Sequence, residues 1–179
     1  IGIGALPLFR TLLMDEPTAA AGWGADFQRA LDSALRFLAY RPRSEAEVRR
    51  RMLRRYPLPL TERVIATLRE TQYLDDAGFA RHWRANRERH RPRSPEMVRQ
   101  ELGRFGVPRE VIDEALEGFD AADNAYRAAR KLATRLARKE YPYFRQRLWA
   151  YLRRRGFGGA IITQTVERLW QELADPPHG

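Results

Sequence analysis

Apolar residues recur every three or four positions from Asp26 onward, and no stretch alternates between apolar and polar residues as a β-strand would. This spacing places the apolar side chains on one face of an α-helix. One such stripe consists of Phe27, Leu31, Ala34 and Leu38. The pattern therefore predicts an all-α protein.

The pattern also repeats along the chain at a constant offset of 50 residues. The sequence of residues 41–44, Arg-Pro-Arg-Ser, returns unchanged at residues 91–94. Apolar positions 98, 102, 107, 111 and 112 return as 148, 152, 157, 161 and 162, with glycine at both 106 and 156. A repeat of this length is typical of stacked supersecondary units that bury their faces against their neighbours. We therefore expect three tandem three-helix repeats in an elongated, curved array, either right- or left-handed.

The same periodicity sets the expected boundaries of the repeats. These are 25–74, 75–120 and 121–174. Residues 1–24 are expected to be a disordered or non-native N-terminal extension, because the first methionine is Met14 and small residues are frequent there. Residues 175–179 are expected to be a flexible tail.

Capping residues mark the expected ends of the helices. Ser44 followed by Glu47 is a capping box, and Ser94 with Pro95 at the first helical position starts the corresponding helix of the next repeat. Thr61 is the expected N-cap of the third helix in the first repeat. The sequence thus predicts a helix break at each of these positions.

Two further signals delimit the second repeat. Asp75 or Asp76 is expected to cap its first helix, and capping explains these carboxylates better than a catalytic or Mg²⁺-binding role. Gly106 is expected to end the middle helix in a left-handed conformation. Pro108 then begins the third helix, whose apolar positions run as far as Phe119.

The composition limits the possible classes of protein. The chain has 179 residues, 33 basic against 23 acidic, and no cysteine, which excludes disulfides, thiolate metal sites and a cysteine nucleophile. A net charge of +10 favours an anionic partner such as nucleic acid, although a genome-wide preference for arginine over lysine gives the same bias. We expect no membrane segment and a cytoplasmic location.

Residues suited to catalysis are not gathered into a recognisable set. His82 and His90 lie eight residues apart, which puts them on different sides of a helix. No glycine-rich phosphate loop is present either. We therefore expect no enzymatic activity, no metal and no cofactor.

Arginine is the residue type that best indicates a function. Arginines flank the apolar stripe of the middle helix in each repeat, and a second cluster surrounds the turn before the middle helix of the second repeat. The candidate partner-binding residues are Arg49, Arg50, Arg54, Arg55, Arg84, Arg87, Arg91, Arg99, Arg104, Arg153, Arg154 and Arg155. Guanidinium groups fit phosphates and acidic side chains equally well. The alternative is a solvated surface in which these arginines are balanced by nearby glutamates.

Aromatic residues are a second candidate for nucleic-acid binding. Exposed rings could stack on single-stranded bases. The candidates are Tyr73, Tyr141, Tyr143, Phe144, Trp149, Tyr151 and Phe157. Most are expected to be core residues, because they lie among positions already assigned to the inner faces.

These motifs, taken in order, resemble the RecX family of bacterial regulatory proteins. The resemblance covers about residues 30 to 173. It rests on Arg41-Pro42-Arg43-Ser44 with Glu47-Val48, on Leu68 to Asp76 ending in Tyr73-Leu74-Asp75-Asp76, on Phe79-Ala80 with Trp83, on Arg99-Gln100-Glu101-Leu102 with Gly106-Val107, and on Arg154-Arg155-Gly156-Phe157. The chain departs from the family pattern at Gln72, where a glycine is usual, and at Tyr56-Pro57, where the other repeats have a glycine-centred turn.

The resemblance implies a modulator, most often an inhibitor, of the RecA recombinase. Such proteins are expected to bind the RecA filament on single-stranded DNA as monomers, and to affect its ATPase, strand exchange and SOS signalling. The alternative is a stand-alone DNA-binding module of the helix-turn-helix type. The sequence leaves open whether the chain inhibits or stimulates, and which repeat contacts RecA and which DNA.

Overall fold

The computed structural model describes residues 24–174. Within this range the chain forms nine α-helices and no β-strand, so the prediction of an all-α protein is confirmed. The helices are α1 (Gly24–Ala39), α2 (Glu45–Met52), α3 (Leu58–Glu70), α4 (Asp76–His90), α5 (Pro95–Phe105), α6 (Arg109–Ala115), α7 (Ala121–Leu136), α8 (Tyr141–Arg153) and α9 (Gly159–Ala174). The expectations for residues 1–23 and 175–179 lie outside the described residues.

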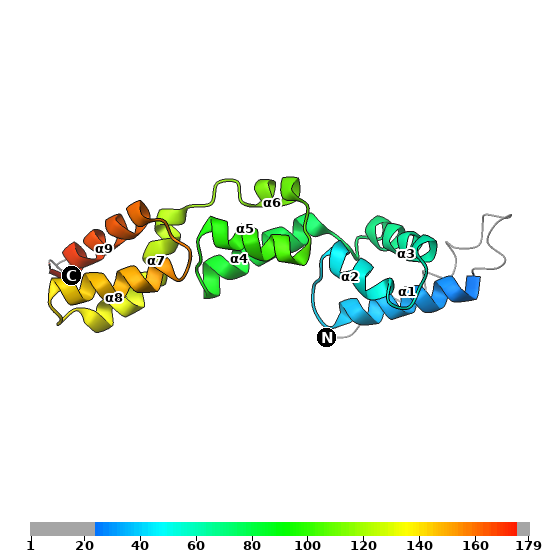
Figure 1. Ribbon diagram of the computed structural model, residues 1–179, viewed down its shortest axis with the longest axis horizontal. Helices are drawn as coiled ribbons and strands as arrows, with labels where there is room; N and C mark the ends of the chain where they lie inside the picture. The colour runs from blue at the N-terminus through cyan, green and yellow to red at the C-terminus, as the bar shows by residue number, and fades with distance from the viewer. Residues whose placement is uncertain (1–23, 175–179) are drawn as a thin grey trace.

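The helices form three groups of three that lie in a row along the long axis of the molecule (Figure 1). We call them repeat 1 (α1–α3), repeat 2 (α4–α6) and repeat 3 (α7–α9). Each repeat has a hydrophobic core of its own. Val48, Val98 and Leu148, which are 50 residues apart in sequence, are all completely buried at corresponding places in the three cores. The elongated array therefore follows from the periodic burial of short helices.

Most of the predicted caps are present. Ser44 accepts a hydrogen bond from the amide of Glu47 and completes the capping box of α2. Ser94 accepts from the amide of Met97 at the start of α5. Of the two aspartates before α4, Asp75 is the N-cap, and its carboxylate accepts from the amide of Gly78.

The prediction that Thr61 caps α3 is wrong. The helix begins at Leu58, with Pro57, four residues before Thr61, in the N-cap position. Pro59 fits inside the first turn because amides there have no partner within the helix. Thr61 therefore lies inside α3, where its amide donates to the Pro57 carbonyl at 3.0 Å.

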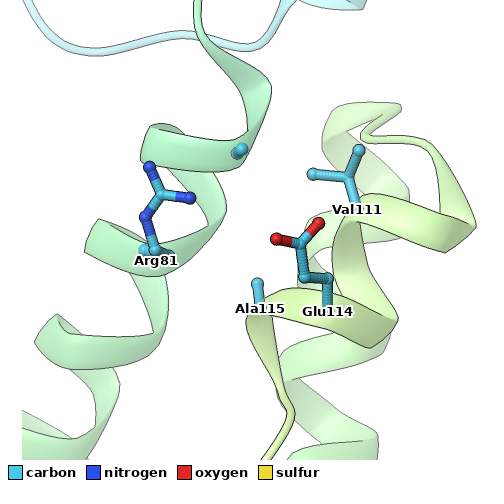
Figure 2. Close-up of a pocket in the computed structure, with 5 residues that line it drawn as sticks. Arg81, Val111, Glu114 and Ala115 are labelled. Carbon is cyan, nitrogen blue, oxygen red and sulfur yellow. The ribbon is translucent and has the colours of Figure 1, made fainter.

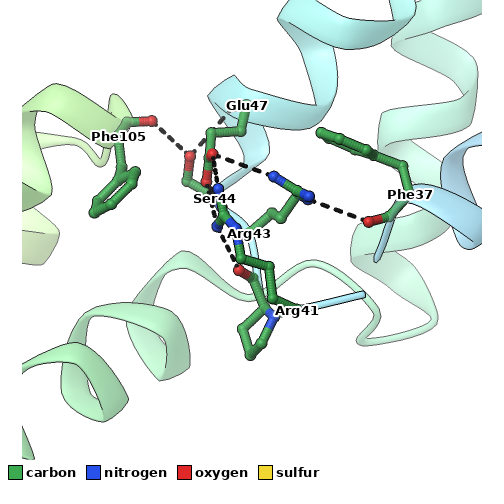
Figure 3. A network of polar contacts seen from close by, with 7 residues as sticks. Phe37, Arg41, Arg43, Ser44, Glu47 and Phe105 are labelled. Carbon is green, nitrogen blue, oxygen red and sulfur yellow. Dashed lines mark hydrogen bonds and ion pairs between the residues drawn. The ribbon is translucent and has the colours of Figure 1, made fainter. Parts of the chain in front are cut away.

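The repeats are joined by polar contacts between their middle helices. At the joint between repeats 1 and 2, which we call joint 1–2, the N-terminus of α2 meets the C-terminus of α5 (Figure 3). The Ser44 hydroxyl donates to the Phe105 carbonyl at 2.5 Å, in addition to accepting from Glu47. The Asp76 carboxylate from the start of α4 accepts from the amide of Glu45 at 2.8 Å. Ser44 is fully buried, so its cap is also a contact between repeats.

The joint between repeats 2 and 3, joint 2–3, repeats this arrangement. The amide of Ser94 at the start of α5 donates to the carbonyl of Arg155, just beyond the end of α8, at 3.0 Å. The buried side-chain amide of Asn124 on α7 donates to the Arg93 carbonyl at 2.7 Å. Each internal joint thus brings a serine-capped helix start against the end of the middle helix of the next repeat.

Glycine is required at the helix ends that enter the joints. Gly106 and Gly156 adopt φ angles of 81° and 86°. A Cβ atom on Gly106 would lie 2.5 Å from the Cβ of Ala46, and one on Gly156 would lie 2.7 Å from the Ser94 hydroxyl oxygen. The left-handed glycine that was predicted at Gly106 is confirmed, and close contact between repeats adds to the conformational requirement.

The two outer ends of the array lack these joint residues. In repeat 1 the turn after α2 carries Tyr56, whose hydroxyl donates to the Arg29 carbonyl of its own repeat at 3.5 Å. In repeat 3, α8 begins after Glu140, whose side chain makes no capping hydrogen bond. The departure at Tyr56 from the glycine of the other repeats is therefore explained, because no other repeat of residues 24–174 packs against that helix end.

Candidate partner-binding surface

The twelve candidate arginines differ in their contacts. Two of them, Arg49 and Arg99, form ion pairs within their own repeats. Arg49 on α2 forms ion pairs with Glu45 at 2.7 Å and with Glu62 on α3 at 2.7 Å. The hydrogen bond to Glu62 is the main reason why the pKa of Arg49 lies well above its ordinary value. Arg99 on α5 likewise forms an ion pair with Asp113 on α6, at 3.0 Å. Both arginines therefore link the middle helix to the third helix of a repeat.

Two more arginines stabilise repeat 2 from α4. Arg84 donates to the carbonyls of Ala115 at 3.0 Å and Glu117 at 2.7 Å, which satisfies free carbonyl groups at the end of α6. Arg87 pairs with Glu101 on α5 at 2.6 Å and lies over the Trp83 ring at 4.5 Å. The guanidinium groups of these two arginines are occupied within the protein.

Arg155 is a further arginine with contacts inside its repeat. Its guanidinium carbon lies 3.6 Å from the centre of the Tyr151 ring, and Nη1 donates to the Tyr151 carbonyl at 3.5 Å. Burial is the main reason why the pKa of Arg155 is lowered from its ordinary value. Its carbonyl also accepts the joint 2–3 hydrogen bond from Ser94, so this residue is tied to the joint.

The other seven candidates are exposed and form no ion pair with any residue between 24 and 174. They are Arg50, Arg54, Arg55, Arg91, Arg104, Arg153 and Arg154. An exposed guanidinium group without a carboxylate nearby keeps its capacity to bind a phosphate or an external carboxylate.

Three of these seven arginines occupy the same position in successive repeats. Arg54, Arg104 and Arg154 are 50 residues apart, and each lies at the C-terminal end of its middle helix or just after it. The joints place these helix ends one after another along the array. We call these three residues the arginine row. Its spacing is that of the repeats themselves.

Most of the aromatic candidates are packed inside the protein. Phe144 and Phe157 are completely buried in repeat 3, and Tyr141, Trp149 and Tyr151 pack partly buried against the same core. Tyr143 and Tyr73, by contrast, keep 46% and 50% of their surfaces exposed. The interpretation of these rings as core residues is therefore confirmed for most of them, while Tyr143 and Tyr73 lie at the surface.

The described surface has two hollows that differ greatly in size. Figure 2 shows a pocket between α4 and α6, lined by Arg81, Val111, Glu114 and Ala115, with a volume of about 40 Å³. That volume is close to the space that a single water molecule occupies in the liquid. The pocket is therefore too small for a cofactor.

A larger open cleft of about 870 Å³ lies between repeats 1 and 2, beside Tyr40, Arg41, Phe79 and His82. Asp75 at its edge is engaged in capping α4. Between residues 24 and 174, no group of three or more histidine, aspartate or glutamate side chains is arranged to hold a metal ion. None of the helices in this range is long and apolar enough to cross a membrane.

The fold defines a helical repeat protein, and comparison with known proteins places it in a family. Models of the first, second and third three-helix domains of RecX match residues 30–68, 75–116 and 120–166. The regulatory protein RecX of Chlorobium limicola is 34% identical over 77% of this chain and 87% of its own length. That of Prosthecochloris aestuarii is 32% identical over 81% of this chain and 96% of its own length. The chain belongs to the RecX family.

Solved structures agree with this assignment at the level of the fold. The crystal structure of RecX from Lactobacillus salivarius superimposes with a TM-score of 0.71 at 19% identity, over 82% of this chain and 97% of the other. A second structure, of a regulatory protein RecX, gives a TM-score of 0.68 at 23% identity, over 89% and 84% of the two chains. The three-repeat architecture is thus shared with both structures.

Proposed function

We propose that this protein regulates the RecA recombinase by binding the RecA filament on single-stranded DNA, and that it acts without catalysis, as a cytoplasmic monomer. The observation that carries the proposal is the arginine row. Its three guanidinium groups recur with the period of the repeats, and none is neutralised by a carboxylate of residues 24–174. A periodic cationic surface suits a partner that is itself a repeating anionic assembly, such as a filament.

The expected effect is inhibition. A rod that bridges successive subunits through its repeats opposes changes in their relative position, and it thereby slows filament growth and the ATP hydrolysis coupled to it. Membership of a family whose relatives are named as regulatory proteins supports the same function. Strand exchange and SOS signalling are expected to decrease for the same reason.

The proposal is tested by the ATPase rate of RecA on single-stranded DNA, measured at substoichiometric amounts of the full chain. We expect a clear decrease for the wild-type protein, and a much smaller one when Arg54→Glu and Arg104→Glu are combined. Two changes of the same kind at exposed arginines outside the row, Arg36→Glu with Arg89→Glu, serve as the charge-matched control. An unchanged ATPase rate across a wide titration of wild-type protein would refute the proposal.

The stand-alone DNA-binding module differs in its behaviour without RecA. Such a module would bind duplex DNA tightly and with sequence preference. Binding to one duplex sequence at least a hundredfold more tightly than to a scrambled one, with no effect on RecA, would favour this alternative.

A further inference from the structure

The positive charge of the chain is unevenly distributed among the repeats. Residues 121–174 contain 12 basic and 4 acidic side chains, against 11 and 6 in residues 25–74 and 9 and 10 in residues 75–120. Within repeat 3, Arg127 pairs with Asp123 and Arg168 pairs with Glu172. The other ten basic side chains of this repeat form no ion pair with any residue between 24 and 174. Repeat 3 is therefore the main source of positive potential in the molecule.

Part of this charge lies along the outer face of α8. Tyr143, Arg147 and Arg154 follow one another at helical spacing on an exposed side of the helix, beside the side that carries the buried residues Phe144 and Leu148. We call these three residues the α8 stripe. The guanidinium carbon of Arg147 lies 6.0 Å from the centre of the Tyr143 ring. The seven residues from Arg147 to Arg154 correspond to about 10 Å along the helix.

The part of the chain that the structure describes leaves this stripe exposed, whereas the corresponding face of repeat 2 is covered at joint 2–3. The residues that precede Tyr143 and Arg147 by 50 positions are Arg93 and Met97, and both lie at joint 2–3. Arg93 accepts the hydrogen bond from Asn124 through its carbonyl, and the Cβ of Met97 lies 3.2 Å from where a Cβ on Gly156 would be. Among residues 24–174, no other repeat packs against the corresponding face of α8, and this face carries an exposed tyrosine and an exposed arginine instead.

The chemistry of the stripe fits a single strand of nucleic acid. An exposed aromatic ring offers a stacking surface to any unpaired base, and arginine forks bind phosphates of the same strand. The bases of a duplex are already stacked and paired, so a lone tyrosine on a convex helix gains nothing from them. An acidic protein surface would use the arginines but has no particular need for the ring.

We propose that the α8 stripe binds single-stranded nucleic acid directly, with Tyr143 stacked on a base and with Arg147 and Arg154 on phosphates of the same strand. The remaining basic residues of repeat 3 attract the strand electrostatically. This inference deepens the proposed function, because it assigns the DNA contact to repeat 3.

The test is the binding of a labelled oligothymidylate strand to the full chain by fluorescence anisotropy, without recombinase and over a range of salt concentrations. Tyr143→Ala is expected to weaken binding between about 5- and 150-fold, whereas Tyr143→Phe retains it. Arg147→Gln is expected to reduce the slope of log affinity against log salt by about 0.7, the amount expected for one lost phosphate contact. Arg36→Gln, which removes the same charge from an exposed site on α1, is the matched control and should keep the wild-type slope. Circular dichroism verifies that each variant is folded.

Several results would overturn the proposal. Wild-type affinity for Tyr143→Ala, or an equal loss for Arg36→Gln and Arg147→Gln, would show that the stripe is not the binding site. Equal binding of duplex and single strand, or complete displacement of the strand by polyglutamate at matched charge, would identify a general anion surface instead. Because RecA is absent from this assay, its outcome is independent of the ATPase experiment, and either proposal can fail alone.

Discussion

Gly156 and Ser94 lie in different repeats, yet a Cβ atom on Gly156 would approach the Ser94 hydroxyl oxygen to 2.7 Å. The amide of Ser94 is also held by the Arg155 carbonyl at 3.0 Å. The backbone of one repeat thus packs directly against the helix cap of its neighbour. The stability of the array depends on this contact as well as on the three separate cores.

Gly156→Ala is expected to destabilise the protein by about 2 kcal/mol or more, because a left-handed alanine costs about 1–2 kcal/mol and the new methyl group also displaces Ser94 or Met97. Urea denaturation followed by circular dichroism measures the change. Gly158→Ala is the matched control, since nothing lies within 4 Å of a Cβ there and its φ is not positive. Equal effects of the two substitutions would contradict the proposed role of the joint.

Gln72→Gly is expected to stabilise the protein by about 0.5–1 kcal/mol. Gln72 has a φ of 60° after the end of α3, in the turn closed by the hydrogen bond from the Leu74 amide to the Leu68 carbonyl at 3.0 Å. Glycine removes the left-handed strain but adds unfolded-state entropy, so the net gain is modest. Thr71→Gly, one position earlier at a φ of −89°, should destabilise instead, because it also removes a hydrogen bond to Thr67. The free energy of unfolding in urea distinguishes the two.

Asp76→Asn should alter how stability depends on pH. Burial is the main cause that raises the pKa of Asp76. The folded state therefore binds this proton more tightly than the unfolded state, and the contribution of Asp76 to stability falls as pH rises above about 4. Asparagine keeps the oxygen that accepts from the Glu45 amide. The variant should thus gain stability relative to wild type between about pH 4 and pH 7, as measured by urea denaturation.

The substitution of an amide by a carboxyl group at joint 2–3, Asn124→Asp, is the converse of Asp76→Asn, and its pH dependence should be opposite. Asn124→Asp replaces the amide that donates to the Arg93 carbonyl with a carboxyl group, which donates only when protonated. This variant should be least destabilised at low pH. If the free energy of unfolding of either variant differed from that of the wild type by the same amount at every pH, the proposed roles of these two carboxyl groups in the joints would be wrong.

Arg49→Gln and Arg54→Gln should affect different properties. The first removes the ion pairs with Glu45 and Glu62 and is expected to lower stability by about 0.5–1 kcal/mol. The second removes an exposed arginine without an ion pair in residues 24–174 and should leave stability unchanged while weakening the effect on RecA. Thermal denaturation and the RecA ATPase rate, measured on both variants, test this distinction. If Arg54→Gln lowered stability and Arg49→Gln weakened only the effect on RecA, the division of the arginines into paired and unpaired groups would be wrong.

The sequence was sufficient to predict the helices and their threefold repetition, because capping and periodic burial are local properties. Ser44, Ser94 and Gly106 were each identified from neighbours within a few residues. Thr61 was misassigned because the first turn of a helix tolerates Pro59, so a proline pair did not mark the boundary as expected.

The contacts of the arginines were not predictable in the same way. Arg49 and Glu62 are 13 residues apart, and Arg87 and Glu101 are 14 apart, on different helices in each case. Only the packing angle between those helices brings the partners together. The charge of repeat 3 could have been found from the sequence by counting basic and acidic residues separately for each repeat.

The joints also bear on self-association. A contact between two different surfaces, such as a capped serine against a left-handed glycine, generates an open fibre if both surfaces are free at opposite ends of a molecule. Here the outer helix ends carry Tyr56 and Glu140 instead. Within residues 24–174, the contact that stacks the repeats is therefore not available at the two outer ends, which opposes head-to-tail association through a copy of the same contact.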